Sequence, residues 1–337
     1  MRYSWAVLFV TILCVGLSTS VVSGEAPSGF FPDGFELPSE MVYIPAGSFV
    51  MGDSFEEGCS DELPLHTVRL SAYYISSYEV TNDEMLAVLE WALAHGRIAV
   101  SDGKVRNTAG EARDILHLGE EQCRILWNGR SFELKAEKAS GYPCVEVSWY
   151  GALAYCNFRS EMEGLTPCYD FSDWSCDWDA NGYRLPTDAE WEMAARGGTA
   201  GHRFPWSDVD TIDHSRANYR SMGDYAYDVS KTAGHHPEYF VRDFPYTSPV
   251  GSFPPNDYGL YDLAGNVWEW CWDYWDTNYY SFSPIANPRG PDSGYYRVVR
   301  SGRWGYDAAM SRVSVRHHGA PAGRRRMGFR IAMSAGS

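Results

Sequence analysis

The sequence predicts an α+β fold with little regular secondary structure, and three observations support this. The 337-residue chain is rich in flat and turn-forming residues, with 13 Trp, 23 Tyr, 15 Phe, 32 Gly and 18 Pro, which is typical of an irregular fold with many turns. Only three stretches, all before about residue 200, combine helical spacing with an N-terminal cap. The remaining chain shows short strand-like pieces. Its 45% apolar content is sufficient for a sizeable core, so we expect a globular protein.

Residues 1–24 are predicted to form a secretory signal peptide. An apolar run from Trp5 to Leu17 precedes small residues, with Val22 and Gly24 at the positions expected before a cleavage site. An uncleaved membrane anchor is disfavoured because the run is shorter than the ~20 residues that a spanning helix needs. Lipid attachment at Cys14 is a weaker alternative. The mature chain is therefore expected to be exported to the periplasm, the cell surface or the medium, with membrane contact only through the signal or such an anchor.

Residues 25–38 are rich in Pro and Gly and are predicted to be a linker, and one domain is expected over residues 39–336. The segment MVYIPAGSFVMGD, which opens it, predicts a hairpin turning at Pro45-Ala46-Gly47. A strand-like run over residues 66–80 leads to Thr81, which with Glu84 forms a capping box for a helix through Ala94. Residues 95–140 show weak periodicity and are expected to be an inserted excursion.

Two further helices follow, and strands are expected near the C-terminus. Ser148 is a candidate cap for a helix over residues 147–163. Thr187 and Glu190 form a second capping box, whose helix is expected to stop at Gly197. Strand-like pieces are predicted at YYRVVR (295–300), SRVSVR (311–316) and GFRIAM (328–333).

Charge is distributed unevenly along the chain. The formal net charge of −16 argues against general nucleic-acid binding, because a polyanion is repelled. The segment from Arg297 to Arg330 nevertheless contains nine Arg and a single acid, Asp307. A basic segment therefore lies within an acidic protein.

Seven cysteines remain after the predicted cleavage, which permits disulfides in an exported protein but leaves at least one thiol unpaired. Cys168 and Cys176, eight positions apart in a turn-rich segment, are the preferred pair. Zinc binding is the alternative, although no CxxC spacing supports it.

Four segments together resemble the formylglycine-generating enzyme family, also called sulfatase-modifying factors. They are MVYIPAGSFVMGD, NGYRLPTDAEWEMAARGG, NDYGLYDLAGNVWEW and the terminal GFRIA, and their order and spacing match over nearly the whole mature chain. The resemblance implies a variant of the C-type-lectin-like fold, with little regular secondary structure around a small twisted sheet.

Oxidases of this family hold copper with two cysteines five positions apart, after a Gly-Gly-Ser-aromatic turn, because thiolates are soft ligands that favour cuprous ion. The matching turn here is Ser301-Gly302-Arg303-Trp304, and the matching positions hold Tyr306 and Ser311. No cysteine follows Cys271, so we expect neither copper nor the family's oxidation of a substrate cysteine.

Iron-dependent relatives of the superfamily use a histidine triad in a separate helical domain, which this chain lacks. Its adjacent pairs, His235-His236 and His317-His318, are expected to diverge on a strand and not to share a metal. Iron is therefore not expected.

The resemblance implies structural calcium. Family members hold it around the GNxWEW turn, with matching positions here at Asp262, Gly265, Val267 and Glu269, which offer the oxygen ligands that a hard cation prefers. The alternative is that the carboxylates cap the turn without metal. A weaker second site would use Asn218 and Tyr219.

The C-terminal segment is predicted to be a ligand-binding face. It occupies the region where catalytic relatives bind a substrate peptide, and its large amphipathic side chains are typical of contact surfaces. Trp304 is expected to be packed, and Arg312, Arg316 and Arg330 are expected to form buried ion pairs. The added arginines favour an anionic ligand, either a protein or peptide or an anionic glycan. The candidate contact residues are Arg303, Trp304, Tyr306, Asp307, Met310, His317, His318, Arg324 and Arg325.

Three functions follow as hypotheses. The first is an exported, calcium-stabilised ligand-binding protein, whose face resembles those that retroelements diversify in some bacterial and phage members of the fold. The second is an oxidoreductase with a metal site rebuilt from other residues. The third is a structural envelope protein. The missing cysteine pair favours the first.

Overall fold

The computed structural model describes residues 29–136, 138–240, 246–323 and 325–336. The predicted signal peptide, part of the linker and the candidate residue Arg324 lie outside these ranges. No helix in the described ranges has the length and apolar character needed to cross a membrane.

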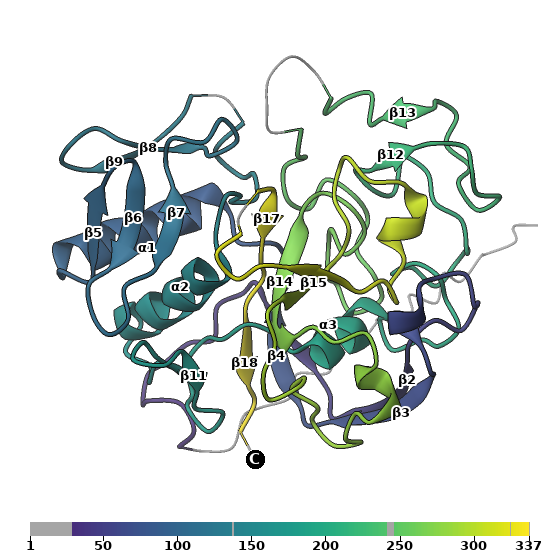
Figure 1. Ribbon diagram of the computed structural model, residues 1–337, viewed down its shortest axis with the longest axis horizontal. Coiled ribbons are helices and arrows are strands. Elements are labelled where there is room, and N and C mark those ends of the chain that lie inside the picture. Colours follow the sequence, from purple (N-terminus) through teal and green to yellow (C-terminus); the bar gives the residue numbers. More distant parts are fainter. Residues whose placement is uncertain (1–28, 137, 241–245, 324, 337) are drawn as a thin grey trace, which may run out of the picture.

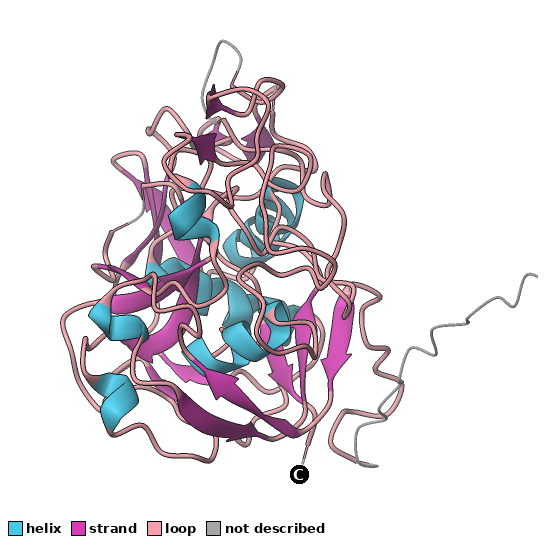
Figure 2. Cartoon of the chain, turned by 90° about the vertical axis from the view of Figure 1, so that its right-hand side faces the viewer, coloured by secondary structure: helices cyan, strands magenta, loops and turns pink. Residues whose placement is uncertain are grey.

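Three α-helices form where the sequence predicts them: α1 (Asn82–Ala94), α2 (Trp149–Met162) and α3 (Asp188–Ala195). The predicted caps are confirmed, since Thr81, Ser148 and Thr187 each accept a hydrogen bond from a first-turn N–H. The other helical elements of the described residues are 3-10 turns. Figure 2 shows that loops make up most of the chain. The 3-10 turns are η1 (Ser60–Glu62), η2 (Tyr279–Ser281) and η3 (Ala308–Ser311).

A four-stranded sheet occupies the middle of the molecule in the order β16-β15-β14-β17 (Figure 1). The β14–β17 pair is parallel and the other two pairs are antiparallel. Within this sheet β16 is an edge strand, which pairs with β15. The strands are β14 (Trp268–Tyr274), β15 (Arg297–Arg300), β16 (His317–Gly319) and β17 (Met327–Gly328).

The predicted N-terminal hairpin is wrong. Its two halves, β1 (Met41–Ile44) and β2 (Gly47–Met51), do not pair with each other. Instead β1 pairs with β4 (Tyr73–Ser76), which also pairs with β18 (Ala332–Ser334), and β2 pairs with β3 (His66–Leu70). This non-local pairing buries Ile44, Val68 and Tyr73 in one apolar cluster with Trp191 of α3, a gain that a local hairpin does not offer.

The predicted strand over residues 311–316 is also wrong. Residues 312–316 pair with no strand in the described part of the chain, and the strand begins only at His317. The carbonyls of Val313 and Val315 accept hydrogen bonds from Arg300 at 3.0 Å each, so buried side chains satisfy the backbone here instead of a neighbouring strand.

The segment between α1 and α2 carries five short strands that pack beside these two helices, at the left of Figure 1. The remaining strands are two-residue ladders. The five strands are β5 (Ile98–Ser101), β6 (Lys104–Asn107), β7 (Asp114–His117), β8 (Ile125–Trp127) and β9 (Phe132–Leu134), and the ladders are β10 (Tyr169–Asp170) with β11 (Ser175–Cys176) and β12 (Arg220–Ser221) with β13 (Gly234–His235).

Buried ion pairs cross the core, and the expectation for the three family arginines is confirmed. Arg312 pairs with Glu62 (2.9 Å), Arg316 with Asp188 (2.7 Å) and Arg330 with Glu269 (2.6 Å), all buried. Arg300, which the sequence did not single out, bonds Asp188 and Glu192 and is wholly buried.

The seven described cysteines are all free thiols, so the expected Cys168–Cys176 disulfide is not present in the structure. The two residues do lie on the β10–β11 hairpin, where Tyr169 pairs with Cys176. The Cys168 thiol instead donates to the carbonyl of Gly182 at 3.3 Å. Burial raises the pKa of both thiols, which holds them in the less reactive protonated form.

Replacing Thr187 by Ala is expected to lower the free energy of unfolding by about 1 kcal/mol, because the N-cap bond to the Glu190 N–H is lost. Urea unfolding of the two proteins measures this. The exposed Thr277, replaced in the same way, is the control and should change little. Equal losses in the two variants would contradict the capping role.

Candidate functional site

The turn from Ser301 to Trp304 anchors the predicted binding segment. Ser301 (φ 79°) and Gly302 (φ 81°) are both left-handed, and a Cβ on Gly302 would lie 2.5 Å from the carbonyl oxygen of Met310. A glycine is therefore required. The turn lies against the predicted metal turn, because the N–H of Gly265 donates to Ser301 (2.7 Å) and the N–H of Trp304 donates to Asn266 (3.0 Å). The two predicted sites are thus direct neighbours.

Trp304 is packed as expected, with 5% of its surface exposed. Its ring centroid lies 4.9 Å from that of Tyr246 and 5.6 Å from that of His235. The guanidiniums of Arg303 and Arg326 lie 5.6 and 4.9 Å from the same indole centroid. Trp304 is therefore a platform for charged side chains and is not itself a contact surface.

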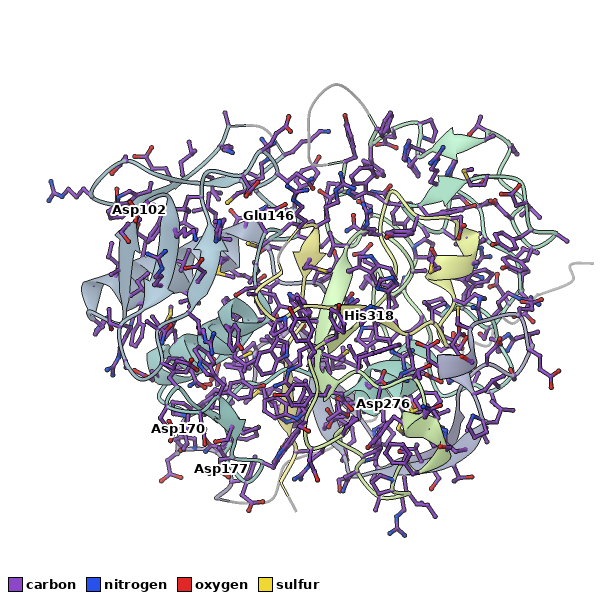
Figure 3. All side chains as sticks on the ribbon, in the orientation of Figure 1. Asp102, Glu146, Asp170, Asp177, Asp276 and His318 are labelled. Atoms are coloured by element: carbon purple, nitrogen blue, oxygen red, sulfur yellow. The ribbon has the colours of Figure 1, made fainter. Side chains whose placement is uncertain are left out.

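A row of rings continues from Tyr306 along the edge strand. Trp268 lies 5.6 Å from Tyr306 and 5.1 Å from His317, and the stacked rings of His317 and His318 lie 5.0 Å apart. Trp275 closes the row, 4.4 Å from His318. Tyr306 and both histidines are half-buried, so the row is partly open to solvent over a packed base. Figure 3 labels His318 in the middle of the molecule, over β15.

The expectation that His317 and His318 diverge is wrong. The N–H of His318 donates to Nδ1 of His317 at 2.8 Å, which folds the His317 ring back along the backbone until the two rings stack at 12°. For the other pair, His235 stacks on Phe240 at 4.0 Å, while His236 lies beside His214 at 5.1 Å.

The other predicted contact residues occupy different places. Asp307 caps η3, accepting from the N–H of Met310 at 3.3 Å, and both side chains are half-buried. Arg325 is exposed and lines a separate cavity of about 240 Å³ beside Glu146, which Figure 3 labels near β17. We define the C-terminal face as Arg303, Tyr306, His317 and His318, which contact one another in sequence, together with Asp307 and Met310, which follow Tyr306 on η3.

Sequence reasoning missed several residues that complete this face. His235 and Phe240, from the β12–β13 region, contact the ring of Trp304, the platform beside the face. Trp268 on β14 contacts His317, and Trp275, just after β14, contacts His318. These residues lie far from the C-terminal segment along the chain, so no local sequence pattern linked them to it. The WEW motif marked Trp268 only as part of the metal turn.

The positions matching the copper cysteines are unsuited to metal capture. Ser311 is 1% exposed and Tyr306 is held between the Arg303 guanidinium and Trp268. Cys271 is fully buried within β14, and burial raises its pKa well above the usual range. A thiolate is therefore disfavoured there as well.

The predicted metal turn is strained and short of positive charge. Asp262 adopts φ 57°, and its Oδ2 accepts from the N–H of Gly251 at 2.6 Å, whereas its buried Oδ1 has no partner. Burial raises the pKa of Asp262 to about 7. Glu269 differs, because Arg330 binds both of its oxygens (2.6 and 2.8 Å) and Trp191 adds a third bond.

Glu79, missed by the sequence reasoning, joins this turn. Its Oε2 accepts from Asn266 at 2.7 Å, and its buried Oε1 has no partner. Burial, with Asp262 and Glu269 adding to it, raises the pKa of Glu79 well above its usual value. Three buried carboxylates thus share one guanidinium, so free oxygens of Asp262 and Glu79 fit a hard cation, while Glu269 does not offer one.

The remaining residues of the two predicted calcium sites are Gly265 and Val267 in the first and Asn218 and Tyr219 in the second. The Gly265 carbonyl lies 3.0 Å from the hydroxyl of Ser301, and Val267 is fully buried. Within the described ranges, no three His, Cys, Asp or Glu side chains converge as a ready metal site. For the weaker site, Asn218 pairs with Gly265 as an isolated bridge, and the Tyr219 hydroxyl donates to Asp228 at 2.5 Å.

Comparisons with known proteins agree with this architecture. A family model described as the sulfatase-modifying factor enzyme 1-like domain matches residues 30–335. The formylglycine-generating enzyme of Streptomyces coelicolor is 33% identical over 313 residues, covering 87% of this chain and 89% of its own. The inactive C-alpha-formylglycine-generating enzyme 2 of Bos taurus is 30% identical over 324 residues, covering 88% of each chain. The structure of Treponema denticola variable protein 1 aligns with a TM-score of 0.61 at 28% identity, over 87% of this chain and 94% of that one. The fold predicted from the sequence is confirmed.

Proposed function

Because the chain belongs to the sulfatase-modifying factor family, we propose that it is an exported, calcium-stabilised protein that binds a ligand through its C-terminal face. In this proposal the family's oxidation of a substrate cysteine has been lost. The ligand is a protein, a peptide or an anionic glycan.

One observation carries the proposal: Tyr306 and Ser311 stand where the copper cysteines belong. Tyr306 is half-buried and packs on Trp268 and Arg303, whereas Ser311 is buried. Aromatic side chains held on a packed base lose little conformational entropy on binding, which favours recognition. The same positions offer no soft ligand for copper.

The names of two relatives are consistent with this direction. One is called inactive, although it covers the chain as fully as the active enzyme does. The other is called a variable protein. We extend to this chain only the idea that the scaffold serves purposes other than oxidation.

Calcium has a specific task in this proposal. A cation at the free oxygens of Asp262 and Glu79 would neutralise two buried carboxylates. The turn that holds Asp262 also contacts the binding turn, through the Gly265-to-Ser301 hydrogen bond. Binding calcium would therefore hold the base of the C-terminal face in place. Export rests on residues 1–24, whose pattern is that of a signal peptide.

The enzymatic arm of the test uses the purified mature chain, a peptide containing a sulfatase-type cysteine motif, copper, dioxygen and a thiol reductant. We expect mass spectrometry to find no formylglycine, with the Streptomyces coelicolor enzyme as the positive control. Formation of formylglycine would overturn the proposal in favour of an oxidoreductase with a rebuilt site.

The binding arm probes arrays of immobilised peptides and glycans. The wild type is expected to bind a subset, and the double variant Tyr306→Ala/His317→Ala is expected to lose about tenfold or more in affinity, as for hot-spot residues. Leu126→Ala, at an exposed position on β8, is the control and should bind as the wild type does. Failure to bind any probe, together with inactivity, would favour a structural envelope role and count against the proposal.

A further inference from the structure

We infer that the C-terminal face contains a site for a tetrahedral oxyanion, the sulfate or phosphate group of an ester ligand, between Arg303, Arg220 and Arg326. This inference rests on the proposed binding function and specifies the chemical group that the face recognises.

Two guanidiniums share one aromatic platform. The Cζ of Arg303 lies 4.3 Å from the ring centroid of Tyr306 and 5.6 Å from that of Trp304, and the Cζ of Arg326 lies 4.9 Å from the latter. A guanidinium on a ring face keeps its N–H donors available in its own plane. Nη1 of Arg303 is buried and makes no hydrogen bond in the described part of the chain. A buried donor of this kind requires an acceptor.

Arg220 approaches from the neighbouring ladder. Its N–H donates to the carbonyl of Tyr306 at 2.8 Å, and it pairs with His235 across β12 and β13, while its side chain is exposed. The ring of His235 lies 5.6 Å from Trp304. Burial lowers the pKa of His235, and the charges of Arg220, Arg303 and Arg326 lower it further. All three guanidinium charges therefore act on one imidazole.

Arg303 is the guanidinium of this group whose burial is best defined. Burial lowers the pKa of Arg303, and the nearby charge of Arg326 adds to that effect. Among the described residues, no ion pair joins a carboxylate to Arg303. Arg326 also has acidic neighbours, because its N–H donates to Glu146 at 3.4 Å and it lines the cavity that contains Glu120 and Glu121, so Arg303 and Arg220 are the residues on which the site depends. In a chain of net charge −16, such a cluster is suited to an anion.

The number of donors selects the kind of anion. A carboxylate has two oxygens and is satisfied by one bidentate arginine, whereas a sulfate or phosphate ester has three terminal oxygens that converging guanidiniums can share. Phe240, 43% exposed and stacked on His235 at 4.0 Å, adds a flat apolar wall for the remainder of the ligand. A ring-shaped body such as a sugar fits such a wall.

Calorimetric titration at constant ionic strength tests this inference, with glucose 6-sulfate, glucose 6-phosphate, glucuronate and glucose as probes. Both esters are expected to bind about tenfold or more tightly than glucuronate, as charge-assisted bonds to extra oxygens predict, and glucose should not bind. The tighter of the two esters identifies the source of the oxyanion. Ester binding should also raise the pKa of His235, which NMR titration of its ring protons measures.

Substitutions locate the site. Arg303→Gln and Arg220→Gln are each expected to weaken ester binding about tenfold, the loss of a charge-assisted pair. Arg289→Gln is the matched control, because this exposed arginine lies 4.1 Å from the Trp178 centroid, away from the C-terminal face, and should bind as the wild type does. If Arg303→Gln fails to fold, the exposed Arg220 decides the question.

Three outcomes would overturn the inference. They are equal affinity for glucuronate, which would favour an acidic peptide as ligand, no binding of either ester, and unchanged ester affinity in a folded Arg303→Gln or Arg220→Gln variant. Array binding that depends on Tyr306 and His317 would still stand in all three cases, and the proposed function with it. Cysteine oxidation would overturn the proposed function independently of the titration.

Discussion

An Arg300→Met variant is expected to lose about 3 to 5 kcal/mol of unfolding free energy, the usual cost of removing one partner from a buried ion network. Arg300 is 0% exposed. Its guanidinium donates to Asp188 (2.5 Å), to Glu192 (2.9 Å) and to the hydroxyl of Tyr280 (3.0 Å). Without it, two buried carboxylates lose a counter-charge.

The loss of unfolding free energy should be large because Arg300 also donates hydrogen bonds to backbone carbonyls. The carbonyls of Val313 and Val315 accept from its Nη1, and no strand is available to replace it. Burial opposes ionisation of Asp188, but Arg300 and Arg316 together hold its pKa below the usual value. Removing one of these arginines therefore destabilises both an ion pair and the segment that leads to β16.

Urea unfolding of the wild type and Arg300→Met measures the effect. Arg325→Met, at an exposed position, is the control and should stay within about 0.5 kcal/mol of the wild type, as is usual for surface changes. A loss below about 1 kcal/mol for Arg300→Met would show that the network is a weak contributor, as buried pairs sometimes are.

Calcium is expected to raise the unfolding free energy of the metal-free protein by about 3 to 4 kcal/mol at several hundred times its dissociation constant. The physical reason is the pair of unpartnered buried oxygens on Asp262 and Glu79. Chelation should reverse the gain. Thermal and urea unfolding with calcium and with a chelator measure it, and magnesium is the control cation because it fits flexible oxygen sites less well.

The unfolding free energy of the metal-free protein should fall as the pH rises. In the metal-free protein, burial raises the pKa of Asp262 from 3.8 to about 7, so the native state retains a proton that the unfolded state releases. The stability contributed by that proton is full below about pH 4 and is lost as the pH rises to about 7. Calcium should flatten this decline. Asp273, whose pKa burial raises to about 8, should contribute a decline that calcium does not affect.

Substitutions test whether Asp262 accounts for the calcium response and for part of the pH dependence. Asp262→Asn should remove both the calcium response and its share of the pH slope, whereas Asp102→Asn, on the exposed turn between β5 and β6, should preserve both. If the wild type unfolds identically with calcium and with chelator, the carboxylates cap the turn without metal, and the calcium part of the proposed function fails.

The sequence alone determined the features that depend on neighbouring residues. Each capping box, at Thr81 and at Thr187, joins residues three positions apart, so the sequence alone predicted where the helix begins. The segments around the GNVWEW motif identified the family and with it the fold. The sequence has no cysteine after Cys271, and the prediction that the copper pair is missing rests on this alone.

The tertiary structure alone decided which distant residues meet. Asn266 reaches Glu79 over 187 positions, which placed a missed carboxylate beside the turn where the sequence predicted calcium. The pairing of β1 with β4 overrode the predicted hairpin, because burial against α3 outweighs a local turn. The N–H of Arg220 met the carbonyl of Tyr306 in the same way. Such contacts follow from how layers pack, and no local pattern encodes them, because their free energy comes from surfaces that only the folded chain brings together.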